Sequence, residues 1–163
     1  MNPYAVKYGL GRAWGGTALT FGMWLVFWFH RTRRLLDGEL GGSRDDAVLH
    51  SIGLLVPVWN ILVLYWLYRD LDELRRWHGL PEIPVAAYVA GGALAPAIMY
   101  SVALGKVNEF WDIRTHGLAA DAPITGGENA LFAVGATLWV ISSAWMVLWV
   151  LFLAGSAPLV DMV

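Results

Sequence analysis

The sequence predicts an all-α polytopic membrane protein with four transmembrane helices, forming one membrane domain over residues 1–163. Of its 163 residues, 58% are hydrophobic and only 15% are charged, whereas a soluble domain is nearer to half apolar and a quarter charged. Four long stretches contain no Asp, Glu, Lys or Arg. The chain also carries ten Trp, a residue that concentrates at the membrane–water interface. Together these features indicate a chain that lies in lipid.

The charge-free stretches set the limits of the spans. Because a transmembrane helix needs about 20 mostly apolar residues, we place the helices at about residues 13–30, 47–68, 83–105 and 129–154. Basic residues follow the first span where a signal peptide would need a small-residue cleavage site. We therefore expect that span to stay attached as an anchor, although its short length leaves open whether it crosses fully.

Amphipathic extensions follow the first and second spans. Residues 31–40 and 69–77 are rich in charge, and the second of these segments contains no helix breaker. In the second extension Leu67, Leu71 and Leu74 recur at helical spacing. These segments predict helices that continue out of the spans and lie at the membrane surface.

One short motif recurs at the ends of the first three spans. An aromatic residue precedes a Trp, and an Arg follows three residues later. The indole is suited to the interfacial belt and the Arg to the headgroups. We interpret these residues as interfacial anchors: Trp28 and Arg31, Trp66 and Arg69, and Trp111 and Arg114. A shift from residue 27 to residue 65 superposes the first two copies and also Gly41 on Gly79, which predicts an internal repeat.

The motifs also carry a resemblance. Thr20-Phe21-Gly22 precedes the first copy, and Asn108-Glu109-Phe110-Trp111 closes the third span. Over roughly residues 13–115 the sequence resembles a bacterial membrane-protein family catalogued as domain of unknown function 4234, which shares a Thr-Phe-Gly start and an Asn-x-x-Trp. The resemblance implies a small multi-pass protein of the bacterial cytoplasmic membrane, and it implies no activity.

Polar and small residues within the spans are candidate binding or packing positions. Pro57 and Pro96 free backbone carbonyls, and Asn60 lies close to the first of them. A broken helix beside an amide can bind an ion or polar ligand, but an interhelical hydrogen bond from Asn is the commoner use. Asn108 belongs to the same set. The spacing of Ala87, Gly91 and Ala95 predicts close helix packing, within the chain or between copies.

The histidines are candidate metal or haem ligands of low specificity. His30, His50 and His116 would lie near helix ends on one side of the membrane. No His-x-x-x-His or Glu-x-x-His spacing accompanies them, and the chain has no Cys. We therefore expect no cofactor.

The sequence favours a non-enzymatic protein that acts through contacts. A net charge of −2 argues against nucleic acid as a partner, and no nucleophile elbow or phosphate-binding glycine loop occurs. The partners we expect are the lipid bilayer and either other membrane-protein subunits or a second copy of the chain. Two alternatives stay open: a small channel or transporter using Pro57, Asn60 and Pro96, and a haem or metal subunit using His30 and His50. Lys and Arg divide five to six between the two sides, so the positive-inside rule sets no orientation.

Overall fold

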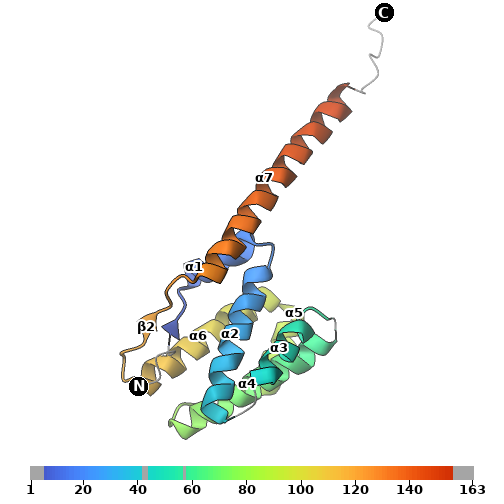
Figure 1. Cartoon of the computed structure of the whole chain (residues 1–163). Coiled ribbons are helices and arrows are strands. Elements are labelled where there is room, and N and C mark those ends of the chain that lie inside the picture. Colours follow the sequence, from blue (N-terminus) through green and yellow to red (C-terminus); the bar gives the residue numbers. More distant parts are fainter. Residues whose placement is uncertain (1–5, 42–43, 57, 156–163) are drawn as a thin grey trace, which may run out of the picture.

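The computed structural model describes residues 6–41, 44–56 and 58–155, and in these ranges the chain forms seven α-helices and two short strands (Figure 1). The helices α1 to α6 form a helical body, and α7 extends from it. The bounds are β1 (Val6–Lys7), α1 (Leu10–Leu19), α2 (Met23–Leu40), α3 (Arg44–Gly53), α4 (Trp59–Trp77), α5 (Val85–Leu94), α6 (Pro96–Arg114), β2 (Ala120–Asp121) and α7 (Gly126–Gly155). The two strands pair in parallel, with Val6 opposite Ala120.

The all-α class is confirmed, but each of the first three predicted spans is divided into two helices. The break in the first lies at Phe21 and Gly22, whose φ angles are 52° and 90°. The second break precedes Val58 (φ 70°), and the third is Ala95, directly before Pro96. Among the described residues only α7 is long and apolar enough to cross a membrane by itself, over Gly126–Leu153. Four transmembrane helices therefore stay a prediction.

At each break the chain reverses and forms a helical hairpin. The Trp24 ring of α2 lies against Gly16 of α1. His50 of α3 stacks on Trp66 of α4, with ring centroids 4.8 Å apart. In the third hairpin the close approach is between Gly91 of α5 and Met99 of α6.

The longer arms of the hairpins, α2, α4 and α6, run in the same general direction and enclose the core (Figure 1). Trp28 of α2 meets Tyr100 of α6 edge to face at 4.9 Å, and the Tyr68 hydroxyl of α4 donates to the Met99 carbonyl of α6 at 3.3 Å. The largest wholly buried side chains of the described residues include Trp24, Trp28, Trp111, Tyr68, Phe29 and Phe110. Aromatic packing therefore accounts for much of the core.

The two predicted extensions are the second halves of α2 and α4. Both are helical, as expected, but their inward faces are buried in the helical body. Leu36 and Leu74 are buried at equivalent positions of the two helices. The two helices also end alike, because Gly41 and Gly79 both have a φ of 71°.

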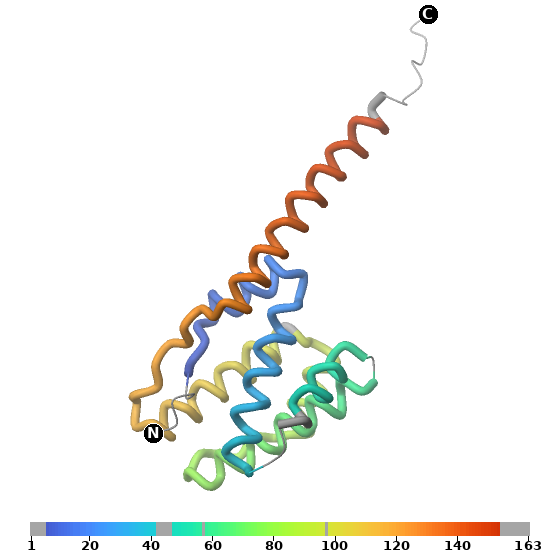
Figure 2. Tube along the Cα trace, in the orientation of Figure 1, coloured from blue at the N-terminus to red at the C-terminus, as the bar shows by residue number. Residues whose placement is uncertain are grey.

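The first part of α7 packs on α1, and the rest projects alone (Figures 1 and 2). Gly135 lies against the backbone of Leu19, and the Trp139 indole donates to the Ala18 carbonyl at 3.2 Å. From residue 140 to residue 153 every side chain is exposed. The helical body therefore supports only the first part of this helix.

The contact at Gly135 gives a test of how α7 is attached. A Cβ at this position would lie 2.4 Å from the Leu19 carbonyl oxygen, a backbone atom that cannot rotate away. We expect Gly135→Ala to destabilise the protein by about 1–3 kcal/mol through overpacking, measured as a lower thermal midpoint by Trp fluorescence in detergent. Gly127→Ala is the matched control on the same helix, because nothing lies within 4 Å of its added Cβ. Equal midpoints for the two variants would contradict the packing.

Candidate functional site

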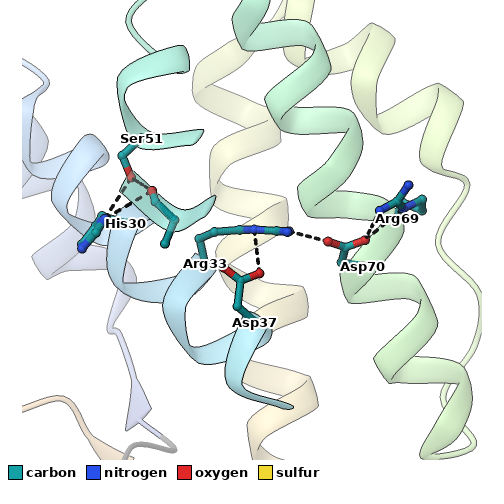
Figure 3. Close-up of polar contacts among 7 residues, drawn as sticks. His30, Arg33, Asp37, Ser51, Arg69 and Asp70 are labelled. Atoms are coloured by element: carbon teal, nitrogen blue, oxygen red, sulfur yellow. Dashed lines mark hydrogen bonds and ion pairs between the residues drawn. The ribbon is translucent and has the colours of Figure 1, made fainter. Parts of the chain in front are cut away.

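A buried ion-pair network joins α2 to α4 (Figure 3). The guanidinium of Arg33 reaches Asp70 across the helix interface at 2.5 Å and Asp37 on its own helix at 2.9 Å. Asp70 also binds Arg69, at 2.8 Å. Arg33 is only 6% exposed. The buried Arg33 and the exposed Arg69 therefore neutralise the two buried aspartates.

This network follows from the sequence of each helix and fixes their register. Arg33 and Asp37 are four residues apart, so they share one face of α2. An unpaired charge left inside a protein is strongly destabilising. Asp70 must therefore lie opposite Arg33, which sets the axial position of α4 against α2.

A second cluster joins α4 to α6. The buried Arg75 donates to Glu109 at 3.0 Å, and Lys106 binds the same carboxylate oxygen at 2.9 Å. The hydrogen bond from Lys106, and after it that from Arg75, lowers the pKa of Glu109 from its ordinary value of 4.5. The carboxylate is thus held in its charged form, as a crosslink between the two helices.

A third cluster attaches α7 to the helical body. Glu128, in the first turn of α7, is wholly buried. It accepts hydrogen bonds from the Trp24 indole at 2.9 Å and from the Nε of Arg12 at 2.8 Å. The Arg12 guanidinium also donates to the carbonyls of Ala122 and Pro123. Arg12 and Glu128 directly precede the predicted spans 13–30 and 129–154, and their opposite charges are the sequence signal that could have indicated this pair.

The three aromatic–Trp–Arg motifs lie apart in the structure, and two of their Trp rings are buried. Trp28 is 2% exposed and Trp111 is 1% exposed, so neither ring can reach lipid headgroups as predicted. Trp66 is half-buried against His50. These indoles pack between helices because ring partners from other segments enclose them, such as Tyr100 against Trp28.

The arginines of the motifs have separate partners. The guanidinium of Arg31 lies 5.6 Å from the ring centre of Tyr8. Arg69 is exposed beside Asp70, and Arg114 lies 3.5 Å from Glu39. The three motifs therefore do not form one binding site.

The predicted polar positions are also separated. Pro57 lies outside the described residues. Asn60 is the second residue of α4 and Pro96 the first of α6, both beside hairpin turns. Asn108 has a packing role, because its amide donates to the Tyr8 carbonyl at 2.9 Å and accepts from the Tyr8 amide at 3.1 Å.

The predicted small-residue stripe is interrupted in the structure. Gly91 faces Met99 of α6, as close helix packing requires. Ala87 is exposed, and Ala95 ends α5. This packing joins elements of the same chain.

The three candidate histidines lie in different surroundings. His30 contacts Ser51 at 3.1 Å, His50 stacks on Trp66, and His116 lies in the turn after α6 with a φ of 54°. Within the part of the chain that the structure describes, no group of three or more His, Cys, Asp or Glu could hold a metal ion. His30 and His50 therefore contact other side chains of the helical body, and His116 is exposed.

No protein-family model, curated protein or solved structure matches this chain. The resemblance of residues 13–115 to domain of unknown function 4234 stays a prediction that depends on the motifs.

The Arg33 network predicts a large and local effect on stability. Arg33→Met leaves Asp37 and Asp70 without their shared cation, and we expect a loss of about 3–5 kcal/mol, measured by denaturant unfolding in detergent. Arg34→Met removes the same charge from an exposed neighbour and should change stability by less than about 0.5 kcal/mol. The double variant with Asp70→Asn should lose less than the sum of the single losses, and strict additivity would rule out direct coupling.

Glu109 predicts a dependence of stability on pH. Because its pKa is lower in the folded protein than its ordinary value of 4.5, its contribution is complete above that value and is lost as the pH falls through the folded pKa. We expect Glu109→Gln to reduce the loss of thermal stability below about pH 4.5. The exposed Glu82 joins none of the ion pairs named here, so Glu82→Gln should leave the profile unchanged. A wild-type profile in both variants would exclude the linkage.

Proposed function

We propose that this chain is a non-enzymatic integral membrane protein that α7 anchors and that acts through contacts with other membrane-protein subunits or with a second copy of itself. The observation that carries the proposal is the exposure of α7. Its most apolar 18-residue window has a mean hydropathy of 2.0 and is 0% buried against the rest of the chain. Such a helix needs lipid, another helix, or both around it.

The chemistry of the helical body supports a contact role. The buried charges of Arg33, Arg75 and Glu128 are each bound to partner side chains on other helices. These ion pairs hold the helices in register. Each buried charge is bound by its partner side chains and is therefore not free to bind a substrate. This arrangement favours a scaffold over a catalyst.

The projecting part of α7 has two different faces. Trp145, Trp149 and Phe152 follow at spacings of four and three residues and form an aromatic ridge, in which Trp149 and Phe152 pack edge to face at 6.0 Å. The opposite side carries Val140, Ser143 and Val147. Small residues such as Ser143 let helix backbones approach closely in membranes, and this side lacks the bulky rings of the ridge, so it is the proposed contact face.

The number of crossings is a separate part of the proposal. The charge-free stretches allow four crossings in a bacterial cytoplasmic membrane, which stays the prediction from the sequence. The hairpin form of α1 to α6 favours a single crossing by α7, because among the described residues only this helix is both long and apolar enough to cross.

The contact face can be tested by crosslinking, because the chain has no native Cys. Single cysteines at Val140, Ser143 and Val147 should give disulfide dimers if the partner is a second copy. A maleimide photocrosslinker on the same cysteines should give one product of defined mass if the partner is another subunit. Cysteines at Trp145 and Trp149 are the controls on the opposite face, and we expect much weaker products from them. A monomer that crosslinks at no position, or equally at all of them, would contradict the proposal.

A further inference from the structure

The turns of all three hairpins lie at one end of the helical body, which we call the turn end. Because α2, α4 and α6 run in the same general direction, their first residues lie toward this end (Figure 1). Contacts with α7 place the turn end along that helix: Trp139 stacks on Phe21 of the first turn, with ring centroids 5.0 Å apart. Beyond Trp139, α7 leaves the helical body.

A layer without formal charge extends from the turn end into the helical body. The first Asp, Glu, Lys or Arg met along each helix from its turn is Arg12 in α1, Arg31 in α2, Asp46 in α3, Arg69 in α4 and Lys106 in α6, and α5 has none. At 1.5 Å per residue the uncharged segments are about 10–15 Å long. The hydrocarbon of one leaflet is about half of 30 Å. The layer therefore has the thickness of a single leaflet.

The turns themselves are apolar and exposed. Leu94, beside the third turn, is 87% exposed, and Val58 in the second is 76% exposed. Phe21 and Leu55 are also exposed. A water-facing turn has no need of such side chains, so their concentration at one end indicates an apolar surrounding.

The backbone amides in the turns donate hydrogen bonds to carbonyls of the adjoining helices. In the first turn the amides of Thr20, Phe21 and Gly22 donate to carbonyls of α1, and the Thr20 hydroxyl accepts from the Trp24 amide. In the second, the amides of Leu54 and Leu55 donate to α3. In the third, Ala95 donates to Gly91, and the next residue is Pro96, which has no amide hydrogen. Backbone at membrane depth is stable only when it is bonded in this way.

The opposite end of the helical body has the reverse character. Its connections are polar, as in His78–Gly79 and Thr115–His116–Gly117. The ion pairs Arg75–Glu109 and Arg114–Glu39 lie along this half. This end suits water and headgroups.

From these observations we propose that the helical body is inserted from one side into a single leaflet, with the three turns near the bilayer midplane, and that α7 alone crosses both leaflets. The surface at the turn end is occupied by lipid hydrocarbon. Residues 129–139 of α7 then span about 16 Å of the first leaflet, and residues 140–153 about 21 Å of the second. The polar connections His78–Gly79 and Thr115–His116–Gly117 then lie on the same side of the membrane.

The proposal rests on the membrane location given under the proposed function, and it makes a different claim from four crossings. With four spans, Gly38 and Glu82 lie on opposite sides. With one-sided insertion they lie on the same side. Both positions suit substitution, since nothing lies within 4 Å of a Cβ added at Gly38 and Glu82 is exposed.

The full chain with cysteines at Gly38 and Glu82, reconstituted into sealed vesicles of phosphatidylcholine and phosphatidylglycerol, tests the proposal without any need for uniform orientation. A polyethylene-glycol maleimide that cannot cross the bilayer adds a visible mass to each accessible cysteine. One-sided insertion gives molecules with no label or two labels. Four crossings give one label on every molecule, which would overturn the inference. The control pair Gly38 and Leu118 gives no label or two labels in both arrangements.

A second measurement separates insertion of the helical body from anchoring by α7 alone. Leu94→Cys should resist the maleimide in intact vesicles, and a bimane attached to it should be quenched most by lipids brominated near the ends of their acyl chains. Labelling of Leu94→Cys in intact vesicles would overturn the inference and leave the anchor in place. A chain that does not enter the vesicles at all would overturn the membrane location as well.

Discussion

The arrangement of the helices depends on the buried ion pair between Arg33 and Asp70. A guanidinium inside the helical body is stable only beside the carboxylates that neutralise it. Only one register of α2 against α4 places Asp70 next to Arg33. That register aligns the uncharged halves of both helices at the same end. Arg75 and Glu109 extend the alignment to α6. The separation of the helical body into an uncharged half and a charged half thus follows from a few interhelical contacts.

Charge-free stretches were enough to locate helices, but they could not show how the helices fold back. The fourth stretch was predicted at 129–154 and is one helix, Gly126–Gly155. The third was predicted at 83–105 and is a hairpin broken at Ala95. A proline such as Pro96 is found both where a helix kinks and where the chain reverses between two helices. The charge-free pattern is therefore the same in both cases. The approach of Gly91 to Met99 decides between them, and such a contact between helices has no periodic signal.

The repeated motif shows the same limit. Its spacing indicated helices, and α2 and α4 agree at equivalent positions: Leu36 and Leu74 are both buried, and Gly41 and Gly79 both have left-handed backbone. The surroundings of the rings come from distant segments. Trp28 is covered by Tyr100, more than seventy residues away, and Arg31 lies over Tyr8 and not over Trp28. An interfacial location inferred from Trp and Arg alone therefore failed for the rings that the core encloses.

The contrast between the helical body and α7 explains how contacts with a partner could form without cost to the fold. The buried charges of the helical body are paired within it, whereas every side chain of α7 from residue 140 to residue 153 is exposed. The two are joined at Glu128, which binds Arg12 of α1 and Trp24 of α2. A carboxylate in the first turn of a helix also interacts favourably with the helix dipole. The contact at Glu128 therefore stabilises the N-terminus of α7. A partner that binds the projecting face of α7 would replace only contacts with lipid. Through the contact at Glu128, a movement of α7 would reach α1 and α2.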